Sequence, residues 1–168
     1  MMNYSSACRM VGLRNVRIGK QAYAMASLYE TDFYAWTQQQ TQLLEQNLWE
    51  KLDLPHLVEE LEDLGRRERQ ELRNRLSVLL GHLLKWHYQP EHRGNSWRAT
   101  IRAQRTQVQL VLSDNPSLKP YLAEALAIAY QLGQDLAVQD TGLDYSTFPV
   151  DCPYNLAQIL DQAFFPNP

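Results

Sequence analysis

Apolar residues recur at every third or fourth position along most of the chain, which is the period of an amphipathic α-helix. The first such pattern predicts a helix from about Thr31 to Leu52. The second predicts a long helix that starts near Asp53, a good N-cap, and ends at Gln89, because the next residue is a proline. Residues 76–88 are apolar around the whole helix, so we expect this part to be central and buried.

The pattern predicts three further helices, each with a recognisable start or end. They are expected from Asn95 or Ser96 through Val111, from Asn115-Pro116 to Gly142, and from Cys152-Pro153 through Phe164. No segment has a convincing strand pattern. The sequence therefore predicts an all-α fold, an antiparallel bundle of four main helices plus a short C-terminal helix, in a single domain over residues 28–168.

Residues 1–27 differ from the rest of the chain in charge and in pattern. They contain Arg9, Arg14, Arg17 and Lys20 and no acid, so the net charge of −3 leaves −7 on the remainder. They have no helical or strand period and lack the apolar core of a signal peptide. Two interpretations stay open: a basic, flexible arm that touches nucleic acid or anionic lipid, or an untranslated stretch before a true start at Met25.

Cysteine count and hydropathy limit the class of protein further. Cys8 and Cys152 are the only cysteines, which excludes a disulfide scaffold and a cysteine-based zinc site. No apolar run approaches the roughly 18 residues of a membrane span. We therefore expect a cytoplasmic protein without a membrane association, and the acidic remainder argues against broad nucleic-acid binding.

Charged residues crowd the first half of the long helix. Acid-first pairs four residues apart, such as Glu62 with Arg66, are worth about 0.2–0.5 kcal/mol each on an exposed helix, and such pairs explain most of these charges. Glu68 is the exception, because it lies on the apolar stripe between Leu64 and Leu72. A buried carboxylate needs a partner, and we expect an arginine of the next helix to supply it.

That next helix carries a row of three arginines spaced four and three residues apart. Such a row suits a phosphate, a nucleic-acid backbone or a carboxylate-rich partner. Pairing with the acids of the long helix inside the same molecule is the favoured interpretation. Together with nearby cations and a tryptophan, the row forms the candidate interaction surface, which comprises Lys85, Arg93, Trp97, Arg98, Arg102 and Arg105.

Signals for catalysis or metal binding are weaker. His82, His87 and His92 are five residues apart, and five residues turn a helix by roughly 140°, so these side chains do not share a face. No nucleophile motif or glycine-rich phosphate loop is present. We predict no catalytic residue, no bound metal and no cofactor. The candidate polar-core or ligand residues are Glu59, Glu62, Asp63, Glu68 and His82.

Seven segments together resemble the bacterial domain-of-unknown-function family 29, which is common in cyanobacteria. They are YETDFYAW (29–36), LVEELEDLGRRER (57–69), HLLKWHYQP (82–90), SWRATIRAQR (96–105), NPSL (115–118), TGL (141–143) and FPVDCPY (148–154). The likeness covers about Leu28 to Phe165. It implies an all-helical fold and a start near Met25, and it brings no established activity, cofactor or catalytic residue.

Three functional hypotheses follow. The leading one is a small helical adaptor or regulatory domain that binds an unknown protein partner and has no catalytic activity. The first alternative is a ligand- or metal-binding helical-bundle enzyme that uses the carboxylates of the long helix with His82. The second is weak nucleic-acid binding through Arg66, Arg69 and Arg73 together with the arginine row. A homodimer is compatible with each of them.

Overall fold

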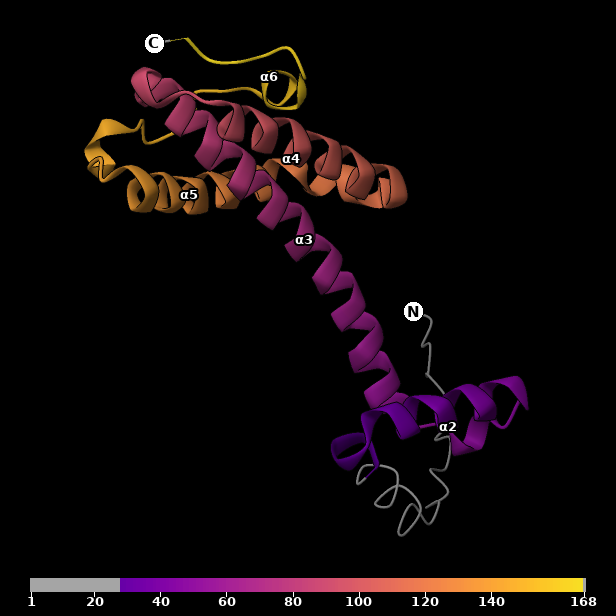
Figure 1. Cartoon of the computed structure of the whole chain (residues 1–168). Coiled ribbons are helices and arrows are strands. Elements are labelled where there is room, and N and C mark those ends of the chain that lie inside the picture. Colours follow the sequence, from indigo (N-terminus) through magenta and orange to yellow (C-terminus); the bar gives the residue numbers. More distant parts are fainter. Residues whose placement is uncertain (1–27, 168) are drawn as a thin grey trace, which may run out of the picture. The chain divides into compact units, whose positions relative to one another are not determined.

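The computed structural model describes residues 28–167, and every regular element in this part is helical, which confirms the all-α prediction (Figure 1). The α-helices are α2 (Phe33–Glu45), α3 (Leu54–Tyr88), α4 (Asn95–Asp114), α5 (Leu122–Thr141) and α6 (Leu156–Leu160). Short 3-10 turns connect them at η1 (Trp49–Lys51), η2 (Pro90–His92), η3 (Pro116–Tyr121) and η4 (Tyr145–Thr147). The predicted basic arm lies outside the described residues.

The chain divides into two compact units, residues 1–60 and 61–168, and the boundary falls inside α3. The described part of the first unit contains α2 and the beginning of α3. The second unit contains the rest of α3 together with α4, α5 and α6. The single domain predicted over residues 28–168 stays a prediction.

Helix α3 is one uninterrupted helix of 35 residues, as the sequence predicts. Helix α2 is shorter than predicted, because it ends at Glu45 rather than near Leu52. Asn47 follows with a φ of 56°, in the left-handed region that asparagine tolerates better than most residues, and this turn breaks the helix. The apolar period continues past the break, which is why the pattern alone overstates the length.

The predicted bounds of the last two helices agree only in part with the structure. Asn115-Pro116 opens a 3-10 turn before α5 begins, and Gly142 ends α5 at a φ of 70°. The last helix was expected from Cys152-Pro153 through Phe164, but α6 covers only Leu156–Leu160. Its true start is Asn155, whose side chain accepts a hydrogen bond from the backbone of Gln158 in a capping box.

Contacts along the second unit show the direction of each helix. Asn115, at the end of α4, donates a hydrogen bond to Glu68 on α3 at 2.9 Å. Near the other end of both helices, Nζ of Lys85 on α3 lies 4.7 Å from the ring centroid of Trp97 on α4. Helices α3 and α4 are therefore antiparallel. Helix α5 runs parallel to α3, because Arg73 contacts Tyr121 and Lys85 contacts Asp140.

The core of the second unit lies on the C-terminal half of α3. Six leucines of α3 have no exposed surface, in agreement with the predicted buried segment, and they pack against Ile101 and Val108 of α4 and against alanines of α5. These leucines are Leu72, Leu76, Leu79, Leu80, Leu83 and Leu84. Within the described residues, no helix has the length and apolar character needed to cross a membrane.

Candidate interaction surface

Lys85, a member of the predicted interaction surface, is buried. Only 4% of its surface is exposed. Its Nζ donates to Asp140 Oδ2 at 2.7 Å and lies 4.7 Å from the ring centroid of Trp97. The ion pair and the cation–π contact link α3 to α5 and α4. Lys85 is therefore part of the bundle interior, and it does not belong to an accessible surface.

Arg105 is fully buried and holds the C-terminal segment against α4. Its Nε donates to the carbonyl of Ile159 at 2.8 Å and its Nη2 to the carbonyl of Phe164 at 2.7 Å. The guanidinium also lies 5.4 Å from the ring of Phe165. Burial lowers its pKa, because desolvation disfavours the charged form. Arg105 is thus also removed from the predicted surface.

The other arginines of the predicted surface are mostly engaged. Arg93 Nε donates to the carbonyl of Trp86 at 2.7 Å, and Arg98 stacks over the rings of Trp86 and Phe165. Arg102 is exposed, and its side chain has no partner among residues 28–167. The row does pair internally, but with carbonyls and aromatic rings rather than with the acids of α3. No pattern in the sequence indicates that residues 159–166 lie beside α4.

The candidate polar-core residues do not converge. Asp63 and His82 lie nineteen residues apart on one continuous helix, which separates them by about 28 Å along its axis. His82 Nδ1 donates to the carbonyl of Val78 at 2.9 Å, whereas Glu62 and Asp63 pair with Arg66. No group of three potential metal ligands occurs in the described part of the chain.

Glu68 differs from its prediction. It was expected to be buried against an arginine of the next helix, but it is exposed and accepts a hydrogen bond from the amide of Asn115 at 2.9 Å. The reason is its position on α3: the fully buried part of the apolar stripe begins only at Leu72. Glu59, the remaining candidate, is also exposed.

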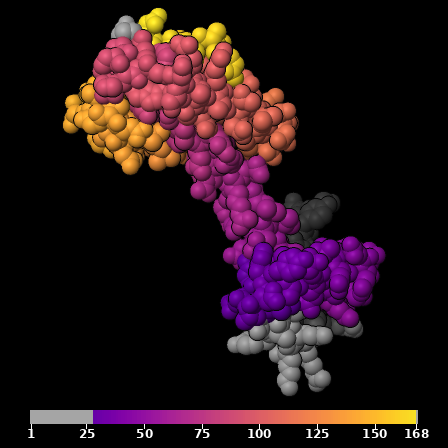
Figure 2. Space-filling model, in the orientation of Figure 1, coloured from indigo at the N-terminus to yellow at the C-terminus, as the bar shows by residue number. Residues whose placement is uncertain are grey.

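The exposed segment of α3, residues 61–70, is the feature that sequence analysis missed. Every residue in it is exposed except Asp63, which is half-buried. Leu61 and Leu64 are 67% and 53% exposed although they continue the apolar stripe of the core. Figure 2 shows this part of α3 at the surface of the second unit. Periodicity could not reveal it, because a covered and an uncovered stripe have the same sequence pattern.

Two hollows adjoin the exposed segment, and both are lined by Gly65 and Arg69. One has a volume of about 270 Å³ and lies on α3 itself, between Glu62, Gly65, Arg66 and Arg69. The other, of about 310 Å³, extends to η3 and is lined by Gly65, Glu68, Arg69, Asn115, Ser117, Leu118 and Tyr121. Gly65 has no side chain and therefore leaves space in the lining of both hollows.

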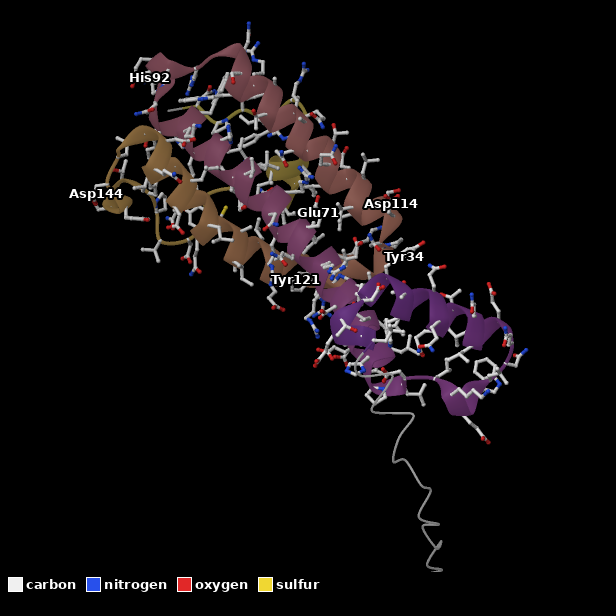
Figure 3. All side chains as sticks on the ribbon, turned by 60° about the horizontal axis from the view of Figure 1, so that its bottom comes forward. Tyr34, Glu71, His92, Asp114, Tyr121 and Asp144 are labelled. Atoms are coloured by element: carbon white, nitrogen blue, oxygen red, sulfur yellow. The ribbon has the colours of Figure 1, made fainter. Side chains whose placement is uncertain are left out.

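Tyr121 fixes the basic end of this segment. It lies beside α3, as its label in Figure 3 shows. The guanidinium of Arg69 is 5.1 Å from its ring centroid, and Nη1 of Arg73 donates to its hydroxyl at 3.1 Å. These contacts orient two cations that the sequence alone could only place on a helix face.

A separate polar cluster organises the first unit. Asp53 Oδ2 accepts hydrogen bonds from Nδ1 of His56 at 2.6 Å and from Nε1 of Trp36 at 3.2 Å. The ring of Tyr29 stacks on His56, and its hydroxyl donates to Glu60 at 2.6 Å. The Asp53–His56 spacing of three residues was the available signal. Because these groups satisfy one another and pack aromatic rings, we interpret the cluster as structural.

Comparison with known proteins gives one family. The family described as Domain of unknown function DUF29 matches residues 28–165, in agreement with the resemblance found in the sequence. No curated protein and no solved structure gave a significant match.

Proposed function

The chain belongs to the family described as Domain of unknown function DUF29, and we propose that it is a small helical protein-interaction domain with an adaptor or regulatory role and without catalytic activity. The recognition element is the exposed segment of α3. It replaces the surface expected from the arginine row, because two of that surface's six residues are buried and three more hold internal contacts.

The observation that carries the proposal is the exposure of Leu61 and Leu64. Burying one leucine side chain contributes about 1.5–3 kcal/mol, so a partner that covers both gains a substantial part of a binding free energy. The segment is also held in place before binding, because α3 continues into the core of the second unit. A preordered helix loses less conformational entropy when it binds than a flexible peptide does.

The two alternatives receive no comparable support. The ligand- or metal-binding enzyme would need a carboxylate near His82, but one uninterrupted helix separates His82 from Glu62 and Asp63 along its axis. Nucleic-acid binding would need free arginines on α3 and along the row, but Arg73 donates to the hydroxyl of Tyr121 and Arg105 is fully buried. We place the adaptor in the reducing cytoplasm of a bacterium, where the free thiol of Cys152 is stable.

The test is affinity capture of the tagged full chain from extract of its native cells. We expect a stoichiometric partner with the wild type, and its loss in the double variant Leu61→Gln/Leu64→Gln. Glutamine is a good helix former, so the variant removes apolar surface while α3 is retained.

The matched control is Leu110→Gln, which changes a similarly exposed leucine on α4 and should retain the partner. An untagged copy of the chain itself counts as a partner in this experiment. Recovery of the same proteins by the wild type and the double variant would contradict the proposal.

A further inference from the structure

We infer that the exposed segment of α3 binds the same segment of a second copy of this chain, in an antiparallel pair with two-fold symmetry. The inference rests on the proposed function, since it identifies the partner of the recognition element named there. Three features of the segment favour this pairing: the order of its charges, the position of Gly65, and the side chains that line the hollow beside it.

The charges of the segment are ordered along the helix. Glu62 and Asp63 lie before Gly65, and three arginines (Arg66, Arg67 and Arg69) with one acid, Glu68, follow it, so the second half is basic overall. Two parallel copies would place acids beside acids and bases beside bases. Two antiparallel copies place the acidic end of each opposite the basic end of the other, which is the favourable arrangement.

One pair of residues fixes the register. Glu62 and Arg69 are seven residues apart, so they lie on nearly the same side of α3. A two-fold axis that passes between Gly65 and Arg66 places Glu62 of each copy opposite Arg69 of the other. The same two side chains line one of the hollows beside Gly65. The pairing therefore occurs twice, once on each side of the axis.

The backbone at Gly65 permits a close crossing. A Cβ atom built at Gly65 would have no neighbour within 4 Å, so the space above it is open to a second helix. The distance between packed helices depends on the side chains at the crossing, and a glycine allows the shortest approach. The crossing is formed by the polar side chains around Gly65, because Leu61 lies about 90° around α3 from the line that joins Glu62 to Arg69 and Leu64 lies on the far side of the helix.

A second copy fits better than a partner with one sign of charge. The segment contains three acids and three arginines, so its net charge is zero, and an acidic or basic peptide would complement only half of it. The complement of the whole segment is the segment itself. The ion pairs already present do not prevent this, because Glu62 and Arg66 are 3.4 Å apart and both well exposed, and such surface pairs contribute little.

The test uses sedimentation equilibrium of the full chain, over a range of concentrations, with charge reversal on each side. The wild type should form dimers as concentration rises. Glu62→Arg alone places two cations together twice, and Arg69→Glu alone places two anions together twice. Each variant should dimerise at least about tenfold more weakly.

An equimolar mixture of the two variants restores both pairs, one with its native signs and one with its signs reversed, so it should form a heterodimer close to wild-type affinity. This rescue can come only from contacts between chains, because a loss of fold in either variant would persist in the mixture. Circular dichroism of each variant checks that the helices remain.

The matched control is Arg102→Glu, which makes the same change in charge on an exposed residue of α4 and should dimerise as the wild type does. A wild type that is monomeric at every concentration would overturn the inference, as would dimers that are unaffected by the single variants or not restored in the mixture. If the wild type is monomeric but native extract still yields a different partner that depends on Leu61 and Leu64, the proposed function stands and only the self-association fails.

Discussion

At the scale of single residues, two glycines decide how closely α3 and α5 pack. Gly81 and Gly133 face each other, and a Cβ built on Gly133 would lie 3.0 Å from the backbone nitrogen of Gly81 and 3.0 Å from Cβ of Leu80. Neither neighbour is the end of a flexible side chain, so the helices themselves would have to move apart. A glycine inside a helix is normally unfavourable relative to alanine, and here the close approach offsets that cost.

We expect Gly133→Ala to lower the free energy of unfolding by about 1–3 kcal/mol, because it overpacks the crossing of α3 and α5. The matched control is Gly65→Ala, which has open space around it and should raise the free energy of unfolding by up to about 1 kcal/mol through helix propensity. Urea denaturation at low protein concentration measures both. Equal effects of the two substitutions would show that the crossing is not tight.

At the scale of elements, α3 combines two environments in one continuous helix. Residues 61–70 are surrounded by solvent, whereas most of residues 76–86 are buried in the core of the second unit. Helical segments of this length are marginal without tertiary packing. The exposed segment therefore depends mainly on the folded part of α3 that extends it, because its exposed ion pairs, such as Arg66 with Glu62, contribute little.

This difference predicts uneven hydrogen exchange along α3. At low protein concentration, amides of residues 61–70 should exchange faster than those of residues 76–86, by at least about tenfold, because local opening exposes no apolar core there. Mass spectrometry of peptides from the labelled full chain measures this. Peptides from α4, which is packed along its inner face, provide the internal reference. Uniform protection along α3 at low concentration would contradict the expected difference.

At the scale of the whole molecule, the helical class, the length of α3 and the buried position of its second half could be predicted from apolar periodicity and helix-end signals. The contacts that the charged residues make could not be predicted from the sequence. Arg105 pairs with carbonyls of residues 159 and 164, which are distant in the sequence and have no pattern that announces a contact. Glu68 has an apolar position in the pattern but lies where no helix covers it.

The stability of the whole molecule should depend on pH through two histidines. Burial lowers the pKa of His82 below its ordinary value of 6.5, and burial together with Arg93 lowers the pKa of His87. A histidine with a lowered pKa binds its proton more readily in the unfolded chain. Its contribution to stability is therefore complete above about pH 6.5. That contribution is lost as the pH falls from there towards the pKa that the histidine has in the folded protein.

We expect the free energy of unfolding to decrease between roughly pH 7 and pH 5, and His82→Gln to make that decrease smaller. Urea denaturation at a series of pH values measures the slope. His92→Gln is the matched control, since His92 is exposed and its replacement should leave the slope as in the wild type. His82→Gln and His92→Gln with identical slopes would show that burial of His82 does not control acid stability. Acid destabilisation also affects the measurement of self-association, because a dimer weakens when its chains unfold. The mixture of charge-reversed variants should therefore be studied above about pH 7, where the contribution of His82 to stability is complete.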